Sequence, residues 1–199
     1  MSKVSVVIPT YNCAGFICCA IKSVLAQTWE DYEIIVVDDG SADDTRIRLA
    51  SYVVKGIIKY VYQENKGLPG ARNAGAAISK GEYIFFLDAD DEIVPDTLRD
   101  MVAAGKETGA GFVISDLMRV EDGHRQVEAA LLPPLGHFYG LLRREFNFQA
   151  RFYRKDVLSG IGLYDQDQKY YEDWDLYIRL FEKKIPYTYV PRVLYVYKI

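Results

Sequence analysis

Short runs of branched apolar residues alternate with stretches of helical periodicity along the first half of the chain. Residues 4–8 form such a run, and apolar side chains then recur three and four positions apart over residues 16–25. The run predicts a buried strand, and the spacing predicts an amphipathic helix. The same reasoning gives strands at residues 34–37, 57–62, 83–87 and 112–115, and helices at residues 41–54, 69–80 and 95–108.

The alternation of strands and helices predicts an α/β fold, with a mostly parallel central sheet and helices on both faces. Three strands end in polar clusters, which are Pro9-Thr10-Tyr11-Asn12, Asp38-Asp39-Gly40-Ser41 and Asp88-Ala89-Asp90-Asp91. In open sheets of this kind, ligands bind at the carboxyl ends of the strands. We therefore expect the three clusters to meet at one cleft.

The second half of the chain has a less regular pattern. A turn is expected at residues 121–125, and residues 131–148 mix apolar and basic side chains without a clear period. Order returns with a strand at residues 150–153, a helix at residues 171–184 and an aromatic strand at residues 187–197. No repeat or linker interrupts the chain, so we expect a single domain.

Size and charge narrow the classes of protein. The chain has 199 residues and a formal net charge of -4, whereas binding to a phosphate backbone needs a basic face. We therefore expect no nucleic-acid partner. No apolar run approaches the roughly 20 residues of a spanning helix, and the first run is too short for a signal peptide, which predicts a cytoplasmic protein.

The Asp88-Ala89-Asp90 sequence is the strongest candidate for metal binding. Two carboxylates one residue apart at a strand end offer the hard oxygen ligands that Mg²⁺ and Mn²⁺ prefer. A cation bound there would neutralise a diphosphate group. Acidic residues at a strand end are also typical of a solvated helix start, so the short motif alone leaves both interpretations open.

Other polar residues near the expected cleft suit a nucleotide. Asp39 can accept a hydrogen bond from a base, and Tyr11 offers a ring for stacking. Arg72 lies at the start of the third helix, where cations and free N–H groups suit phosphates. Asp173 lies in the first turn of the last strong helix, where a carboxylate can act as a general base or simply cap the helix.

Taken together, these motifs resemble those of the family 2 glycosyltransferases. The resemblance rests on the three strand-end clusters, on Asn65-Lys66-Gly67 through Ala71-Arg72-Asn73, and on Glu172-Asp173-Trp174-Asp175-Leu176. It covers nearly the whole chain and is weakest over residues 120–149. It implies a GT-A fold with a Rossmann-like nucleotide-binding half. The implied activity is inverting transfer of a hexosyl or N-acetylhexosaminyl group from a UDP-sugar.

The resemblance also implies roles for single residues. Those implied to hold the nucleotide are Pro9, Thr10, Tyr11, Asp39, Arg72 and Asp88. Asp90 would ligate the Mn²⁺ or Mg²⁺ ion that bridges the two phosphates, and Asp173 would deprotonate the acceptor hydroxyl. The acceptor would be a glycan or a lipid-linked molecule, as in the synthesis of polysaccharides, glycolipids or cell-surface glycans.

The resemblance also bears on how the chain is divided. In this family a histidine commonly follows the final aromatic strand and completes the metal site, whereas this sequence ends at Tyr197-Lys198-Ile199. We expect a nucleotide-sugar-binding half at about residues 1–115 and an acceptor-binding half at about residues 116–199 that is truncated at its C-terminus. Residues 131–148 either pack a small subdomain or face the acceptor or a membrane, which would make the protein peripherally membrane-associated.

Two other functions stay open at this stage. A phosphatase with an aspartate nucleophile also carries a D-x-D sequence after an apolar strand. Glu92, however, stands where the haloacid dehalogenase pattern has threonine or valine, and the Glu172-Asp173 pair would have no role. A nucleotide-sugar-binding module without turnover fits the same motifs, and nothing in them excludes it.

Overall fold

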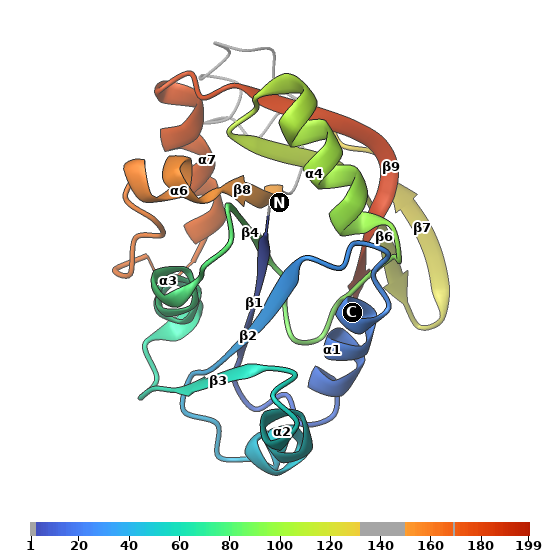
Figure 1. The fold of residues 1–199 in the computed structure, drawn as a ribbon, viewed down its shortest axis with the longest axis vertical. Coiled ribbons are helices and arrows are strands. Elements are labelled where there is room, and N and C mark those ends of the chain that lie inside the picture. Colours follow the sequence, from blue (N-terminus) through green and yellow to red (C-terminus); the bar gives the residue numbers. More distant parts are fainter. Residues whose placement is uncertain (1–2, 132–149, 169) are drawn as a thin grey trace.

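A mixed sheet forms the centre of the fold (Figure 1). The structure is a computed structural model and describes residues 3–131, 150–168 and 170–199. The strands are β1 (Val4–Thr10), β2 (Tyr32–Asp38), β3 (Lys59–Tyr62), β4 (Tyr83–Phe86), β5 (Glu92–Ile93), β6 (Phe112–Glu121), β7 (His124–Glu128), β8 (Ala150–Arg154) and β9 (Tyr187–Lys198). Their order in the sheet is β3-β2-β1-β4-β8-β6-β9-β5, and β7 pairs with β6.

Helices cover both faces of this sheet, as the sequence predicts. One face packs against α1 (Ile17–Leu25), α2 (Thr45–Val54) and α4 (Thr97–Thr108), and the other against α3 (Gly67–Ile78), α6 (Lys155–Gly160) and α7 (Glu172–Glu182). Figure 1 shows α3, α6 and α7 together on one side of the strands. Alternate residues of β1 enter the two cores, Val6 and Ile8 on the first face and Val7 on the second, because successive side chains of a strand point to opposite faces.

The two halves of the sheet differ in strand direction. β1 pairs in parallel with β2 and β4, and β2 pairs in parallel with β3. Beyond β4, the strand β8 is antiparallel to both β4 and β6, while β6 and β9 are parallel. The carboxyl ends of β1, β2 and β4 therefore share one edge, which brings their polar clusters together.

Most predicted elements are present, with boundaries that differ by a few residues. The turn expected at residues 121–125 connects β6 and β7. The short β5, the strand β7 and the helix α6 were not expected, and β6 continues to Glu121 instead of ending near residue 115. Apart from Leu131, the segment at residues 131–148 lies outside the described residues.

Close contact between α3 and β1 fixes the helix that starts at the strand ends. A Cβ atom placed on Gly75 would lie 2.3 Å from Cγ1 of Val7, so only glycine permits this approach. The helix is thereby held directly against the sheet, and its first turns project toward the polar edge.

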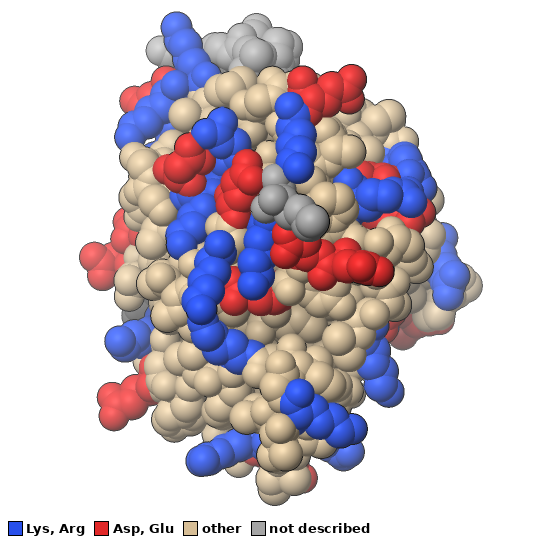
Figure 2. Space-filling model, in the orientation of Figure 1, with Lys and Arg blue, Asp and Glu red and all other residues tan. Residues whose placement is uncertain are grey.

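The surface carries both signs of charge. Figure 2 shows lysine and arginine side chains next to acidic ones on the face drawn, with no continuous basic area there. Among the helices of the described residues, none is long and apolar enough to cross a membrane.

Candidate active site

The carboxyl ends of β1, β2 and β4 surround a cavity of about 850 Å³, which we call the strand-end cavity. Most of the residues singled out in the sequence line it, namely Pro9, Thr10, Tyr11, Asp39, Asp88 and Asp90. The start of α3 and two further tyrosines, Tyr170 and Tyr197, complete the wall. The prediction that the three strand-end clusters meet at one cleft is therefore confirmed.

Asp39 is buried at the end of β2 with one carboxylate oxygen bonded and one free. Its Oδ1 accepts hydrogen bonds from Nε2 of Gln63 at 2.6 Å and from the N–H of Lys66 at 2.9 Å. Its Oδ2 has no hydrogen-bond partner in the described part of the chain. The neighbouring Asp38 instead accepts a hydrogen bond from the hydroxyl of Tyr60 at 2.7 Å. Asp39 alone of the pair therefore offers the cavity a free acceptor.

Two groups contributed by β1 and its loop also lack partners. The hydroxyl of Thr10 is buried, yet no described residue bonds its Oγ1. Leaving a buried polar group unpaired costs about 1–3 kcal/mol, which a ligand or water in the cavity would recover. The side chain of Tyr11 is 51% exposed. This end of the cavity therefore combines an open aromatic ring with unsatisfied polar atoms.

Asp88 has both carboxylate oxygens paired with guanidinium groups. Nη2 of Arg72 lies 2.9 Å from Oδ1, and Nη1 of Arg151 lies 2.7 Å from Oδ2. Burial by itself would raise the pKa of Asp88, but the charges of Arg151 and Arg72 outweigh it and lower the pKa to about 2. Asp88 is therefore ionised and held in place from two sides.

Arg72 lies behind the cavity wall and connects three elements. Only 3% of its side chain is exposed, and it is not among the residues lining the cavity. Besides bonding Asp88, its Nη1 donates to Oε1 of Glu172 at 2.9 Å, and its guanidinium lies 5.1 Å from the ring centroid of Tyr164. Arg72 thus joins α3, the end of β4 and the start of α7.

The two aspartates that follow Ala89 have opposite environments. Asp90 is exposed in the cavity and has no partner among the described residues. Asp91 is buried, and it accepts hydrogen bonds from the Tyr195 hydroxyl at 2.6 Å and from the Lys198 N–H at 2.9 Å. Burial raises the pKa of Asp91 to about 7. Asp90 is consequently the free carboxylate at this strand end.

The helix α7 carries the acidic pair that the sequence singles out. Its apolar face is buried through Leu176, Tyr177, Leu180 and Phe181. The residue before it, Tyr171, has a φ of 60°, which turns the chain sharply into the helix. Asp173 stands in the first turn, where its Oδ1 accepts the N–H of Trp174 at 2.9 Å. Asp173 does not itself line the strand-end cavity, but the bond from Arg72 to Glu172 ties its helix to the cavity wall.

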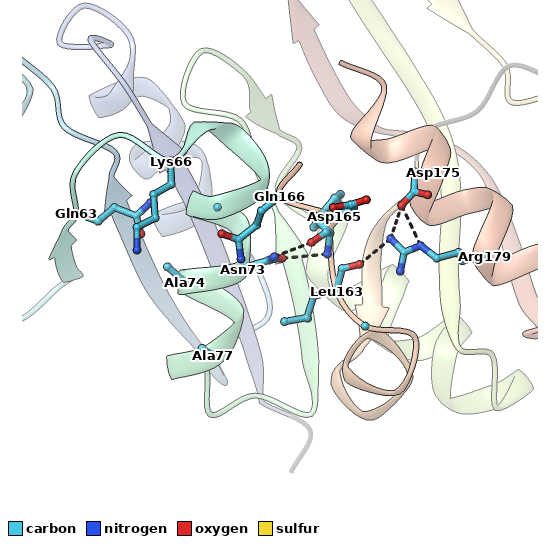
Figure 3. Close-up of a pocket in the computed structure, with 13 residues that line it drawn as sticks. Gln63, Lys66, Asn73, Ala74, Ala77, Leu163, Asp165, Gln166, Asp175 and Arg179 are labelled. Atoms are coloured by element: carbon cyan, nitrogen blue, oxygen red, sulfur yellow. Dashed lines mark hydrogen bonds and ion pairs between the residues drawn. The ribbon is translucent and has the colours of Figure 1, made fainter. Parts of the chain in front are cut away.

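A second cavity of about 750 Å³ lies between α3, α7 and residues 162–166, and we call it the side cavity (Figure 3). The amide of Asn73 forms two hydrogen bonds with the backbone of Tyr164, at 2.8 and 3.0 Å. Arg179 donates to the carbonyls of Ile161 and Leu163 and forms an ion pair with Asp175 at 2.6 Å. These contacts anchor the segment that leads into α7.

The model of glycosyl transferase family 2 matches residues 5–162 of the chain. The chain belongs to this family. A relative from Nostoc sp., named uncharacterized glycosyltransferase alr2836, is 39% identical over 130 residues, covering 64% of this chain and 40% of the relative. The succinoglycan biosynthesis protein ExoO of Rhizobium meliloti is 38% identical over 138 residues, covering 66% of this chain and 40% of ExoO. The chain therefore spans about two fifths of the length of these relatives.

The fold of this family 2 chain is also that of a solved structure. The crystal structure of S. aureus TarS 1-349 in complex with UDP-GlcNAc superimposes with a TM-score of 0.76 at 23% identity, covering 99% of this chain and 58% of TarS 1-349. This likeness confirms the predicted α/β fold of GT-A type.

The aspartates of this family 2 chain can be tested for their fit to a divalent metal. No group of three or more histidine, cysteine or acidic side chains converges on a point within the described residues. Mg²⁺ typically uses one or two carboxylates together with substrate phosphates and water. Asp90, with a free carboxylate in the cavity, fits that pattern, whereas both oxygens of Asp88 are occupied. The residues therefore fit a metal that arrives with a diphosphate.

Several residues of this family 2 site were missed in the sequence. Arg151 and Tyr195 hold Asp88 and Asp91, and Tyr170 lines the cavity. Arg151 is an arginine within a predicted strand, at a position whose neighbours Phe152 and Tyr153 are buried. A charge in such a strand is a signal for a buried ion pair, although it does not identify the partner.

Proposed function

We propose that the chain is an inverting, metal-dependent glycosyltransferase that moves a sugar from a UDP-sugar to an acceptor hydroxyl. The observation that carries this proposal is the pair Asp88 and Asp90, in which one carboxylate is fully paired and the other is free in the same cavity as the free acceptor of Asp39. The UDP-GlcNAc bound to TarS and the biosynthetic role in the name of ExoO support the same donor class and the synthesis of a glycan.

The strand-end cavity would hold the nucleotide. In this proposal the base donates a hydrogen bond to Oδ2 of Asp39 and stacks on Tyr11, while Pro9 and Thr10 line the base and ribose positions. Thr10 would gain a partner for its buried hydroxyl. Asp88 would contact the ribose region. Arg72, expected to help bind the nucleotide, would do so by orienting Asp88 from behind, since its guanidinium is buried.

The proposed metal is Mn²⁺ or Mg²⁺, held by Asp90 and by the donor's phosphates. When bound, such an ion supplies positive charge that stabilises the departing diphosphate. The protein's part is to present the Asp90 carboxylate at a fixed strand end, and the paired Asp88 two residues earlier provides that rigidity.

We assign the role of general base to Asp173. Its carboxylate would take the proton from the acceptor hydroxyl as the oxygen attacks the anomeric carbon, and the bond to the diphosphate would break on the opposite face. One displacement of this kind inverts the configuration. The buried face of α7 and the contact between Arg72 and Glu172 keep this carboxylate in position. The acceptor, a glycan or lipid-linked molecule, would bind to the half of the chain that follows residue 115.

The two alternative functions make different demands on the same residues. A D-x-D phosphatase would need Asp88 as its nucleophile, but both of its oxygens are paired with arginines. A binding module without turnover would need only the cavity. Sugar transfer or donor hydrolysis therefore separates the module from the enzyme.

Ligand-dependent stability tests the donor site. A ligand that binds only the folded state raises the melting temperature, so UDP with Mn²⁺ should stabilise the chain. Asp90→Ala should remove the metal-dependent part of the shift and keep the rest. An unchanged melting temperature with saturating UDP and Mn²⁺ would contradict the proposed donor site, and an unchanged Mn²⁺ response in Asp90→Ala would contradict the metal ligand.

A kinetic comparison tests the base. Asp173→Asn keeps the shape of the side chain but removes the proton acceptor, so transfer should fall by roughly 10²- to 10⁴-fold while UDP affinity stays nearly constant. Glu172→Gln should lower the rate of transfer by less, because glutamine retains a hydrogen-bond acceptor for Arg72. Near wild-type transfer by Asp173→Asn in a protein of the relatives' full length would rule out Asp173 as the base. Loss of UDP binding would instead make it a donor-site or structural residue.

A further inference from the structure

Tyr170 is an unusually open aromatic side chain for its position. It lines the strand-end cavity, yet 77% of it is exposed, more than any other aromatic residue in the described part of the chain. Neither its ring nor its hydroxyl has a hydrogen bond, ring contact or ion pair with another described residue. The ring and the hydroxyl of Tyr170 are therefore both available to a molecule in the cavity.

The place of Tyr170 along the cavity follows from the strand order and from the contacts of Arg72. Moving along the sheet from β2 through β1 to β4, the wall presents Asp39, then Tyr11, then Asp88 and Asp90. Tyr170 comes two residues before Glu172, and the guanidinium of Arg72 bonds both Glu172 and Asp88. Tyr170 therefore belongs to the part of the wall near the end of β4, where Asp88 and Asp90 lie.

A UDP-sugar bound along this wall would have its base, its diphosphate and its sugar at successive positions in the cavity. Its base lies at Asp39 and its diphosphate at Asp90, so the group beyond the diphosphate extends toward the start of α7. That group is the sugar to be transferred. Tyr170 is three residues from Asp173, so a sugar bound there would also be close to the proposed base.

Anchored residues precede and follow Tyr170 in the chain, at Tyr164 and at residues 171–172. On the C-terminal side, the carbonyl of Tyr171 accepts the N–H of Asp175 at 3.1 Å, and Arg72 bonds Glu172 at 2.9 Å. On the N-terminal side, Asn73 anchors Tyr164 through two hydrogen bonds. An aromatic side chain next to the anchored start of α7 loses little conformational freedom when a ligand binds.

We propose that Tyr170 is a specificity-determining residue that packs its ring against the transferred sugar of the donor; this rests on the proposed function. One face of a pyranose carries mainly C–H groups, which suit an aromatic surface, while its hydroxyl groups suit the polar edge of a tyrosine. The ligand class is a nucleotide-linked hexose or N-acetylhexosamine. Tyr11, at the other end, contacts the base and would not distinguish one sugar from another.

Calorimetric titration of UDP and UDP-sugars, with Mn²⁺ present, tests this proposal. UDP-GlcNAc, UDP-glucose, UDP-galactose and UDP-glucuronic acid are screened first, and the tightest-binding one is used throughout. Tyr170→Ala should weaken the UDP-sugar by roughly 3- to 10-fold, as expected for loss of an aromatic contact, and change UDP affinity by less than about 2-fold. Tyr170→Phe should retain most of the affinity for the UDP-sugar.

Tyr62→Ala provides the matched control, because Tyr62 is 57% exposed at the end of β3 and does not line the cavity. It should leave both affinities unchanged. Equal losses of UDP and UDP-sugar in Tyr170→Ala would place Tyr170 on the nucleotide and overturn the proposal, as would no loss of either. Binding of UDP but of no UDP-sugar by the unmodified chain would also overturn it. Failure of the unmodified chain to bind UDP would instead overturn the proposed function on which it rests.

Discussion

The strand-end cavity and the side cavity are similar in volume but differ in what their polar side chains contact. In the side cavity, Asn73 and Arg179 form hydrogen bonds with backbone groups of the protein itself (Figure 3). In the strand-end cavity, Asp90, Tyr170 and Oδ2 of Asp39 have no partner among the described residues. The two cavities therefore differ in how their charged groups are used, which agrees with the proposal that the strand-end cavity binds the ligand.

The strand-end cavity also contains a supporting layer of its own. Asp88 lines the cavity, and its charge is paired with those of the largely buried Arg72 and Arg151, which do not line it. Paired residues should therefore matter for stability in the absence of ligand, and free residues should matter only when a ligand is present. The free energy of unfolding, measured by urea denaturation in EDTA, separates these two groups.

The largest change in the free energy of unfolding is expected for Asp88→Asn. Removing this charge leaves two buried guanidinium groups without their common partner, so the free energy of unfolding should fall by roughly 3–5 kcal/mol. Urea denaturation at pH 7.5 measures it. A loss below about 1 kcal/mol would mean that water reaches the arginines and that Asp88 belongs with the free groups.

A smaller effect is expected in the side cavity for Asn73→Ala. The substitution leaves the N–H and carbonyl of Tyr164 without their partner, which should cost roughly 2 kcal/mol. Gln166→Ala is the matched control, because Gln166 lines the same cavity but has no partner among the described residues. If the control destabilised the chain as much as Asn73→Ala, the distinction between paired and free side chains would not hold there.

Asp91 should make stability depend on pH. Its pKa is about 7 in the folded chain and 3.8 when unfolded, so between these values the folded state retains a proton that the unfolded state has lost. Stability should therefore fall as pH rises through this window, by up to about 1.4 kcal/mol per pH unit, and level off above pH 7. Denaturation of wild type and Asp91→Asn at pH 5, 6, 7 and 8 measures the difference, and identical pH profiles would contradict it.

The smallest effect on stability is expected for Asp90→Asn. This carboxylate is exposed and unpaired, and such surface substitutions usually change the free energy of unfolding by less than about 0.5 kcal/mol. The same variant should lose the stabilisation by UDP that depends on Mn²⁺. A large loss of stability without ligand would show that Asp90 has a structural partner.

Much of the strand-end cavity was predictable because its residues directly follow apolar strands. Runs such as residues 34–37 can only be buried, and the polar residues after them must then lie at a sheet edge. The sequence could not show which of Asp88, Asp90 and Asp91 is free. That depends on Arg151 and Tyr195, which reach these aspartates from 63 or more positions along the chain.

The elements that were missed share a physical reason. The second part of β6 pairs with β7 and mixes apolar with charged residues such as Arg119, so its strand character comes from its partners rather than from its own sequence. β5 has only two residues and depends on β9. Strand preference varies with the neighbours that a strand packs against, so local patterns are weakest for elements of this kind.

The position of β8 limits how the molecule can move. It is hydrogen-bonded to β4, at the end of the parallel strands, and to β6 on its other side, so the sheet is continuous from β3 to β9. A hinge motion that separated β4 from β6 would break the backbone hydrogen bonds of β8, each worth about 1 kcal/mol. In the proposed function, the donor would therefore enter and the products would leave by movement of the loops at the strand ends, above a sheet that keeps its shape.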